Sequence, residues 1–343
     1  LSQFSLWYNQ AGTPNVTASV SWDGVTGALT LDLEQAVRAT PGEARKKLMH
    51  IPLAFGLVGP DGKDMQPSSV EGAVVTGDVL HLRKRSQKVV FHGLPHRPVV
   101  SLNRSFSAPV TLSLAQSAED LMFLARHDSD LFSRWQAFNT MLLMEALVAA
   151  SRALTGGVEP CFSPEIADLA GALAGDDTLE AAFRAQALSL PGESDIAREL
   201  GSNIDPNAVF GARDRLARLI AAANRELFTR LHEELADVRA YSPDAASAGR
   251  RALRNVVLDY LATLDGGAAL SAEHFRAATN MTDRAAGLTV LVHRHGGSPE
   301  ADEALARFEE RYADVPLALD KWLAIQAGAP GEGALETVLK LVK

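Results

Sequence analysis

The sequence predicts a two-part chain, with an immunoglobulin-like antiparallel β-sandwich over residues 1–114 and an all-α superhelical array over residues 115–343. Up to residue 114, apolar and polar residues alternate, which is the period of a strand with one buried face. From residue 119 onward, apolar residues recur every three or four positions, which is the period of an amphipathic helix. With 343 residues, 47% of them hydrophobic, the chain is long enough for two or three domains with real cores.

Short alternating runs separated by turn sequences fill the first part. The run 16–22 ends at Asp23-Gly24, and the run 51–57 ends at the Gly-Pro-Asp-Gly sequence of 59–62. The remaining runs cover 29–33, 70–75, 79–82, 89–91, 99–102 and 110–114. Eight short strands with turns between them predict a sandwich of immunoglobulin size.

A long amphipathic helix is expected where the period changes, over 119–154. Its apolar face carries a stripe that we expect to be core, with Trp135 buried near the seam with the sandwich. Asn139, Glu145 and Arg152 interrupt the most apolar window, so we expect no membrane span. The stripe consists of Phe132, Trp135, Phe138, Leu142 and Ala146.

The rest of the chain carries repeated helix-start signals. The side chain of a capping residue accepts a hydrogen bond from a backbone N–H that has no partner within the helix. A proline at the first helical position has no backbone N–H, so it leaves no donor unsatisfied there. Thr282-Asp283 predicts a further start, where the acidic charge suits the helix dipole. The rhythm predicts about ten helices stacked in an irregular superhelix. The proline signals are Ser163-Pro164, Asp205-Pro206, Ser242-Pro243 and Ser298-Pro299.

The net charge and the number of cysteines exclude several classes of function. The formal net charge of −9 argues against a nucleic-acid partner, because phosphate contacts need surplus Lys and Arg. Cys161 is the only cysteine, which excludes an intrachain disulfide and a zinc site built on thiolates. We therefore expect a reducing, cytoplasmic location. No signal peptide is visible, and apolar residues near both ends, such as Trp7 and Val342, predict a fragment that self-associates.

Short motifs occur along the whole chain, from Trp-Tyr-Asn-Gln-Ala-Gly-Thr-Pro at 7–14 through Phe-Ser-Arg-Trp at 132–135 to Asp-Lys-Trp at 320–322. They resemble those of one known family, the bacterial aminopeptidase N or alanyl aminopeptidases, zinc enzymes of the thermolysin-like clan. The resemblance is to the third domain and the first part of the C-terminal fourth domain of that family. It departs at Asp130-Leu131-Phe132, where members tend to have Asn-Asp-Phe. The motifs are Trp-Tyr-Asn-Gln-Ala-Gly-Thr-Pro at 7–14, Ala-Thr-Pro at 39–41, His-Ile-Pro at 50–52, Ser-Phe-Ser-Ala-Pro-Val at 105–110, Arg-His at 126–127, Phe-Ser-Arg-Trp at 132–135, Ile-Asp-Pro at 204–206, Leu-Arg-Asn at 253–255, Asn-Met-Thr-Asp at 280–283 and Asp-Lys-Trp at 320–322.

The resemblance implies a zinc-dependent parent enzyme that removes N-terminal residues from peptides. Its chemistry needs His-Glu-x-x-His and Gly-x-Met-Glu-Asn, and neither motif occurs in this sequence. His232-Glu233 starts the first motif correctly, but Ala236 stands where the second histidine should be. We therefore predict no catalytic, cofactor-binding or metal-binding residue here, and we assign the zinc to the parent enzyme alone.

The role that the resemblance implies is structural. The sandwich would brace the catalytic domain of the parent, and the helical array would cover the active site and restrict access to small or unfolded peptides. The partners implied are the catalytic domain and the peptide substrates of the parent. The alternative is a non-enzymatic β-sandwich plus helical scaffold that binds a protein partner.

Other candidate sites have simpler structural explanations. His92 and His96 have the spacing of metal ligands on a helix, but Gly93 and Pro95 between them forbid the helix. Histidines at i and i+2 point to different helix faces, and basic runs beside strands guard exposed edges. The glycine spacing of 59–63 fits a hairpin turn rather than a phosphate-binding loop. The remaining residues interpreted in this way are His293, His295, Arg83, Lys84, Arg85 and Lys88.

Overall fold

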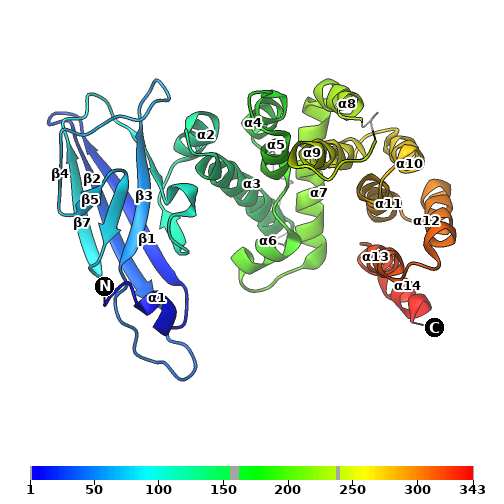
Figure 1. Cartoon of the computed structure of the whole chain (residues 1–343), viewed down its shortest axis with the longest axis horizontal. Coiled ribbons are helices and arrows are strands. Elements are labelled where there is room, and N and C mark those ends of the chain that lie inside the picture. The colour runs from blue at the N-terminus through cyan, green and yellow to red at the C-terminus, as the bar shows by residue number, and fades with distance from the viewer. Residues whose placement is uncertain (1, 155–161, 237–239, 343) are drawn as a thin grey trace. The chain divides into compact units, whose positions relative to one another are not determined.

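The computed structural model describes residues 2–154, 162–236 and 240–342 (Figure 1). Tertiary contacts divide the chain into two compact units, Leu1–Met141 and Leu142–Lys343, and each unit is described by itself. Cys161 lies outside the described residues. The boundary predicted at residue 114 is the end of the last strand, and the helix that follows it, Ala118–His127, still belongs to the first unit.

Two β-sheets form the bulk of the first unit. A short helix, α1 (Leu6–Asn9), precedes them. Among the described residues, one sheet has the strand order β4-β7-β2-β1-β9 and the other β5-β6-β3-β8. The strands are β1 (Pro14–Asp23), β2 (Ala28–Val37), β3 (Ile51–Val58), β4 (Ser69–Glu71), β5 (Val74–Thr76), β6 (Val79–Leu82), β7 (Ser86–His92), β8 (Val99–Leu102) and β9 (Thr111–Leu114).

The sandwich predicted from the alternating runs is confirmed, with two differences. Strand β9 pairs parallel to β1, so the first sheet is not wholly antiparallel. The single run predicted over 70–75 is two strands, β4 and β5, which belong to different sheets. Gly72 separates them with φ +84°, and a Cβ there would lie 1.9 Å from the carbonyl oxygen of Lys88. Glycine is therefore required where the chain crosses between the sheets.

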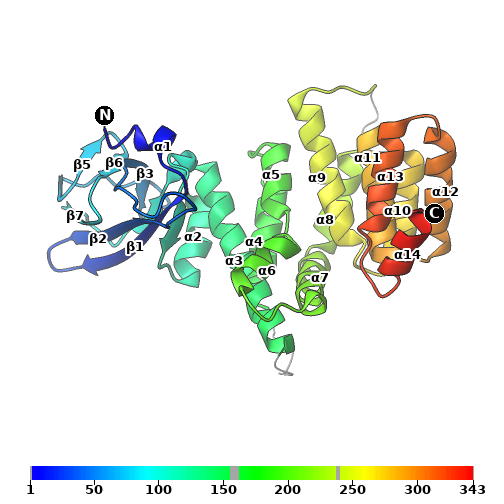
Figure 2. The same cartoon turned by 90° about the horizontal axis from the view of Figure 1, so that it is seen from below.

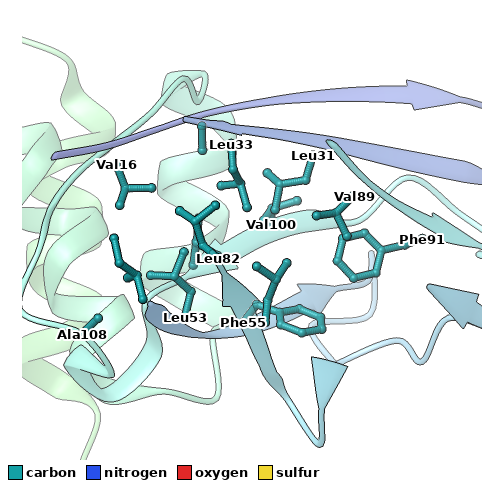
Figure 3. Close-up of a cluster of buried hydrophobic side chains, with 14 of the residues drawn as sticks. Val16, Leu31, Leu33, Leu53, Phe55, Leu82, Val89, Phe91, Val100 and Ala108 are labelled. Atoms are coloured by element: carbon teal, nitrogen blue, oxygen red, sulfur yellow. The ribbon is translucent and has the colours of Figure 1, made fainter. Parts of the chain in front are cut away.

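The core of the first unit lies between the two sheets (Figure 3). Inward residues such as Leu31 of β2 and Leu53 of β3 are fully buried, as the alternation predicts. The rings of Phe55 and Phe91 meet across the two sheets with centroids 5.2 Å apart. Burial of this apolar face stabilises the sandwich at about 25 cal/mol per Å² of apolar surface.

Helices make up the remainder, thirteen of them among the described residues against about ten predicted. Two begin in the first unit, α2 (Ala118–His127) and α3 (Leu131–Leu154). The expectation of a single helix over 119–154 is therefore wrong, because the chain breaks at 128–130, where Asp130 caps the start of α3. Several pairs of consecutive helices of the second unit pack side by side, for example α10 with α11 and α11 with α12 (Figure 2). The others are α4 (Pro164–Gly175), α5 (Ala181–Leu188), α6 (Glu193–Leu200), α7 (Pro206–Ala223), α8 (Arg225–Glu234), α9 (Ala245–Leu261), α10 (Gly267–Ala277), α11 (Met281–His295), α12 (Pro299–Tyr312), α13 (Pro316–Ala327) and α14 (Ala334–Leu341).

Two helix starts differ from the prediction. Helix α9 is capped by Asp244, which accepts from the Ser247 amide, rather than by Ser242. Helix α11 is capped by Asn280, so it begins before Thr282. Each sequence offers two capping residues close together, and sequence signals define a helix end only to within one or two residues. The starts predicted at Pro164, Pro206 and Pro299 are confirmed.

The aromatic stripe on α3 is core only in part. Phe138, Leu142 and Ala146 are buried, but Phe132 and Trp135 are only half-buried, so the prediction that Trp135 is core is wrong. By length and apolar composition alone, α3 is the one helix of the described chain that could cross a membrane, a test that buried helices of soluble proteins also pass.

Candidate functional site

The first polar cluster lies where the chain leaves the sandwich, and it begins with a strained loop. The 3-10 turn η1 (Arg104–Phe106) follows β8 and Asn103. Asn103, Ser105 and Phe106 have φ values of 64°, 52° and 52°, a region that non-glycine residues rarely adopt. Such backbone strain persists only where surrounding contacts over-determine it, and it concentrates at functional sites.

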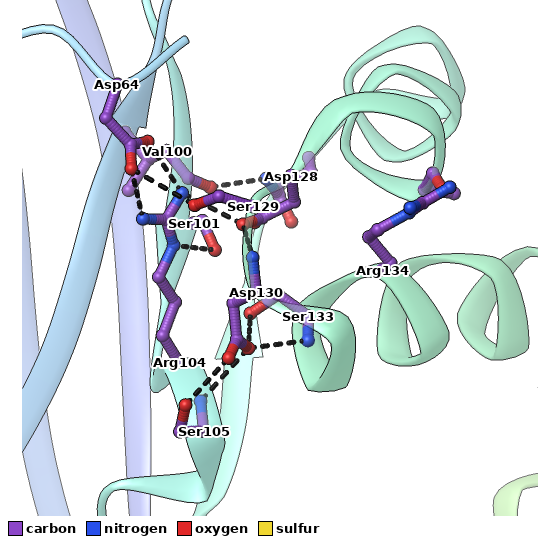
Figure 4. Close-up of polar contacts among 12 residues, drawn as sticks. Asp64, Val100, Ser101, Arg104, Ser105, Asp128, Ser129, Asp130, Ser133 and Arg134 are labelled. Carbon is purple, nitrogen blue, oxygen red and sulfur yellow. Dashed lines mark hydrogen bonds and ion pairs between the residues drawn. The ribbon is translucent and has the colours of Figure 1, made fainter. Parts of the chain in front are cut away.

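Arg104 is the centre of this cluster (Figure 4). Its side chain is 90% buried and donates to both carboxylate oxygens of Asp64, at 2.7 Å each. The same guanidinium lies 2.9 Å from the Asp128 carboxylate, and its Nε donates to the Ser101 hydroxyl at 3.2 Å. A Cβ on Gly56 would lie 1.9 Å from the guanidinium carbon, so a larger residue there would displace the Arg104 side chain from this position.

Asp130 joins the strained loop to the start of α3. One carboxylate oxygen accepts from the Ser105 amide at 3.0 Å, and the other accepts from the Ser105 hydroxyl at 2.7 Å. Asp130 also accepts from the amide and hydroxyl of Ser133, at 2.8 Å and 2.9 Å, which caps the helix. One side chain thus fixes both the loop and the direction of the helix.

The carboxylates of this cluster have pKa values displaced in opposite directions. Hydrogen bonds from Arg104 hold the pKa of Asp64 below its usual value, although burial opposes them. Burial raises the pKa of Asp130, but the hydrogen bonds from Ser105 and Ser133 outweigh it and lower the net value. Burial dominates at Asp128 and raises its pKa, because that side chain is fully shielded from water. Asp128 therefore depends on Arg104 to stay charged.

Further contacts fix α2 on the sandwich. The Arg97 guanidinium donates to both carboxylate oxygens of Asp120, at 3.0 Å and 2.8 Å, in the first turn of α2. The Arg134 Nε donates to the Ala125 carbonyl oxygen at 3.1 Å, which links α3 to α2. The cluster is a rigid junction between the sandwich and the first two helices.

The second polar cluster borders a cavity of about 880 Å³ between α5, α7, α9 and α11. Arg294 donates to both oxygens of Asp259, at 2.7 Å and 3.0 Å, and to Asp214 at 2.9 Å. The buried Tyr260 hydroxyl donates to the Leu188 carbonyl oxygen at 2.7 Å. Two carboxylates, one on α7 and one on α9, already neutralise Arg294 of α11. We therefore assign these contacts the role of holding the three helices together.

The incomplete zinc motif occupies a buried position in the second unit. His232 Nε2 and His274 Nδ1 lie 2.9 Å apart, whereas Glu233 is exposed. Burial lowers the pKa of His232 to about 3 and that of His274 to about 4, so both rings are neutral at pH 7. Within 2–154, 162–236 and 240–342, no three His, Cys, Asp or Glu side chains are grouped so as to hold a metal ion.

The other sequence candidates are not brought together. His92 lies 3.6 Å from Glu71, while His96 is exposed in a loop. His293 Nε2 lies 2.9 Å from the Ile325 carbonyl oxygen. His293 and His295 both border the cavity of about 880 Å³, but within the described residues they belong to no group that could hold a metal ion. Residues 83–85 are exposed in the turn between β6 and β7, and 59–63 forms a hydrogen-bonded turn, as predicted.

Sequence reasoning missed the Arg104 cluster. Its partners lie far apart in the chain, and isolated charged residues are mostly solvated, so no local signal identifies them. Asp130 could have been found, because an aspartate just before a helical period is a capping signal.

Comparisons with known proteins cover the whole chain. Residues 118–343 match the family model of a domain of unknown function described as ARM repeats (DUF3458_C), and residues 12–115 match a domain of unknown function with an Ig-like fold (DUF3458). Aminopeptidase N of Caulobacter vibrioides is 39% identical over 345 residues, which is 100% of this chain and 38% of that protein. Aminopeptidase N of Escherichia coli is 33% identical over 352 residues, again 100% of this chain and 39% of the relative.

A solved structure agrees on the fold. The crystal structure of Legionella pneumophila aminopeptidase A in complex with aspartic acid matches with a TM-score of 0.82 at 24% identity, over 100% of this chain and 39% of that one. The chain thus spans about two fifths of the length of the relatives it matches. The chain belongs to the aminopeptidase N family, of which it carries the Ig-like domain and an array of ARM repeats.

Proposed function

We propose that this chain is a non-catalytic portion of a zinc-dependent aminopeptidase, that its sandwich braces the catalytic domain, and that its helical array covers the active site. The observation that carries the proposal is the similarity of the entire chain to aminopeptidase N, at 39% identity to the Caulobacter vibrioides relative. The missing His-Glu-x-x-His and Gly-x-Met-Glu-Asn motifs support a non-catalytic role.

The junction around Arg104 supports the bracing role. A buried guanidinium shared by Asp64 and Asp128 leaves the sandwich and α2 little freedom to move against each other. Asp130 extends this rigidity into α3. A rigid connector is what a domain needs if it is to hold another element in place over an active site.

The helical array supports the covering role. Its helices pack pairwise from α4 to α14 and form an extended layered surface rather than a closed bundle. We propose that this surface limits access to small or unfolded peptides. We further propose zinc as the metal of the parent enzyme, held outside this chain, and a cytoplasmic location, on the basis of the single cysteine.

A chimaera tests the access role. The matching 345 residues of the Caulobacter vibrioides aminopeptidase N are replaced by this chain. The chimaera should remove alanine from a short peptide but leave an alanine at the N-terminus of a folded protein in place. Equal rates on the two substrates would contradict the covering role. A folded chimaera that cleaves neither would favour the alternative of a partner-binding scaffold.

A further inference from the structure

A positively charged cavity of about 630 Å³ lies between α10, α11 and α12 in the second unit. Figure 2 shows these three helices as neighbours. Four guanidinium groups and one carboxylate line the cavity, an excess of positive charge on a chain whose net charge is −9. The lining residues are Phe275, Arg276, Arg284, Arg307, Glu310 and Arg311.

Arg284 is the residue that points to a ligand. It is only 8% exposed, yet its guanidinium donates to neutral acceptors, the Tyr312 hydroxyl at 3.1 Å and the Ala278 carbonyl oxygen. No ion pair joins Arg284 to a carboxylate among the described residues. A guanidinium has five N–H donors, and a buried charge is normally compensated by a counter-charge.

The other three arginines leave an excess of positive charge at the cavity, because two carboxylates, Glu310 and Glu303, stand against four guanidiniums. Arg307 and Arg276 share one carboxylate, that of Glu303, at 2.7 Å and 3.9 Å. The Arg311 guanidinium carbon lies 5.8 Å from the centre of the Tyr312 ring, a cation–π contact that supplies no negative charge.

A purely structural role explains only part of this arrangement. By donating to the Ala278 carbonyl oxygen, Arg284 caps the C-terminal end of α10 and fixes the turn into α11. That contact accounts for the position of the side chain, but it does not explain why a buried cation faces a cavity that carries three more.

We propose that this cavity binds a small anion that carries two or more phosphate groups. Arginine forks match phosphate oxygens with paired hydrogen bonds, and they retain their charge at any physiological pH. A tetrahedral oxyanion is only a few times larger than a water molecule, which takes about 30 Å³ of liquid. A volume of about 630 Å³ therefore has room for more than one such group. Phe275 is buried, so its ring offers no free face to a nucleobase, and the phosphates carry the recognition.

Binding would have a structural consequence. Arg276 belongs to α10, Arg284 to α11 and Arg307 to α12, so one anion would cross-link three consecutive helices. A ligand that binds only the folded array stabilises it by mass action, by RT ln(1 + [L]/Kd).

The test is calorimetric titration of the 343-residue chain with inorganic pyrophosphate, with sodium chloride holding the ionic strength constant. The Arg307→Gln/Arg311→Gln variant removes two exposed guanidiniums and should weaken binding at least tenfold. The matched control, Arg198→Gln/Arg230→Gln, removes two exposed arginines from other helices and should bind as the parent does. Equal weakening in both variants, or no saturable binding by the parent chain, would overturn the proposal.

Two further arms address Arg284 and the number of phosphates. Arg284→Lys keeps the positive charge but loses the paired N–H donors of the guanidinium, so pyrophosphate should bind at least tenfold more weakly. Thermal unfolding of this variant without ligand checks that it is folded. Orthophosphate should bind the parent chain at least tenfold more weakly than pyrophosphate does. Equal affinity for orthophosphate and pyrophosphate would overturn the inference that the site holds more than one phosphate.

Discussion

Replacing Arg104 by methionine tests the junction most sharply. The substitution keeps the apolar stem but removes the charge that compensates Asp64 and Asp128, and the Asp128 side chain is 0% exposed. Removing one partner of a buried ion pair costs about 3–5 kcal/mol, because the other charge stays buried without compensation. The control is Arg97→Met, whose side chain is 54% exposed although that of its partner Asp120 is only 12% exposed. Its cost should therefore lie between the roughly 0–1 kcal/mol of a fully exposed pair and the cost of Arg104→Met.

The chain allows an assay that observes only the first unit. Of its four tryptophans, Trp7, Trp22 and Trp135 belong to Leu1–Met141, and Trp322 belongs to the second unit. In a Trp322→Phe background, urea unfolding followed by fluorescence therefore reports on the sandwich and its junction. An Arg104→Met variant within about 1 kcal/mol of its parent, or one equal to Arg97→Met, would refute the reasoning.

The pH dependence supplies a second signature. Burial raises the pKa of Asp128, so its ionised form destabilises the folded state at neutral pH, and protonation relieves that cost as pH falls. Without Arg104 the pKa should rise further, so the cost of Arg104→Met should shrink between pH 7 and pH 5. In the parent chain, Asp64 affects stability only near and below about pH 4, because Arg104 depresses its pKa. Arg104→Met removes those hydrogen bonds, so Asp64 should contribute to the decrease in cost in the same direction as Asp128. A cost unchanged over this window would contradict the role of Asp128.

Three other predictions concern the second unit. His232 and His274 stay neutral in the folded chain but protonate near pH 6.5 in the unfolded chain. The unfolding free energy should therefore fall as pH falls below 6.5, by about 2 kcal/mol per histidine at pH 5. If the urea midpoints of the parent and of a His232→Gln/His274→Gln variant change equally with pH, the histidines are not the cause. Tyr260→Phe should cost about 1–2 kcal/mol in unfolding free energy, since it leaves the Leu188 carbonyl oxygen unsatisfied, and no measurable cost would show that water replaces the hydroxyl. An exposed apolar stripe on and just after α14 should drive self-association in sedimentation, and serine substitutions that leave the association unchanged would assign it elsewhere; the stripe consists of Leu335, Leu339 and Val342.

Local periodicity was sufficient to predict the architecture. The alternation over 51–57 predicts β3 because each inward residue needs only to be apolar, whatever strand it faces. Gly72 shows the limit, since the run around it alternates normally and only its left-handed backbone splits the run between two sheets. The motifs that resemble aminopeptidase N predicted the family, and the comparisons confirm it.

Burial along a helix face was harder to predict. The period of α3 correctly places Trp135 and Phe138 on one face, but it does not say how much of that face meets a neighbour. Arg104 presents the same difficulty more strongly. Asp64 lies 40 positions away in the chain, and nothing in either local sequence distinguishes a buried pair from two solvated charges.

The central claim is that this chain serves an aminopeptidase without supplying its chemistry. It is tested most directly by measuring alanyl-anilide hydrolysis, with zinc present, for two samples, the chain alone and the Caulobacter vibrioides aminopeptidase N that carries this chain in place of its matching 345 residues. The account predicts no turnover by the chain alone and turnover by the chimaera that a chelator abolishes. Chelator-sensitive turnover that co-purifies with the chain alone, or a folded chimaera without activity, would contradict it.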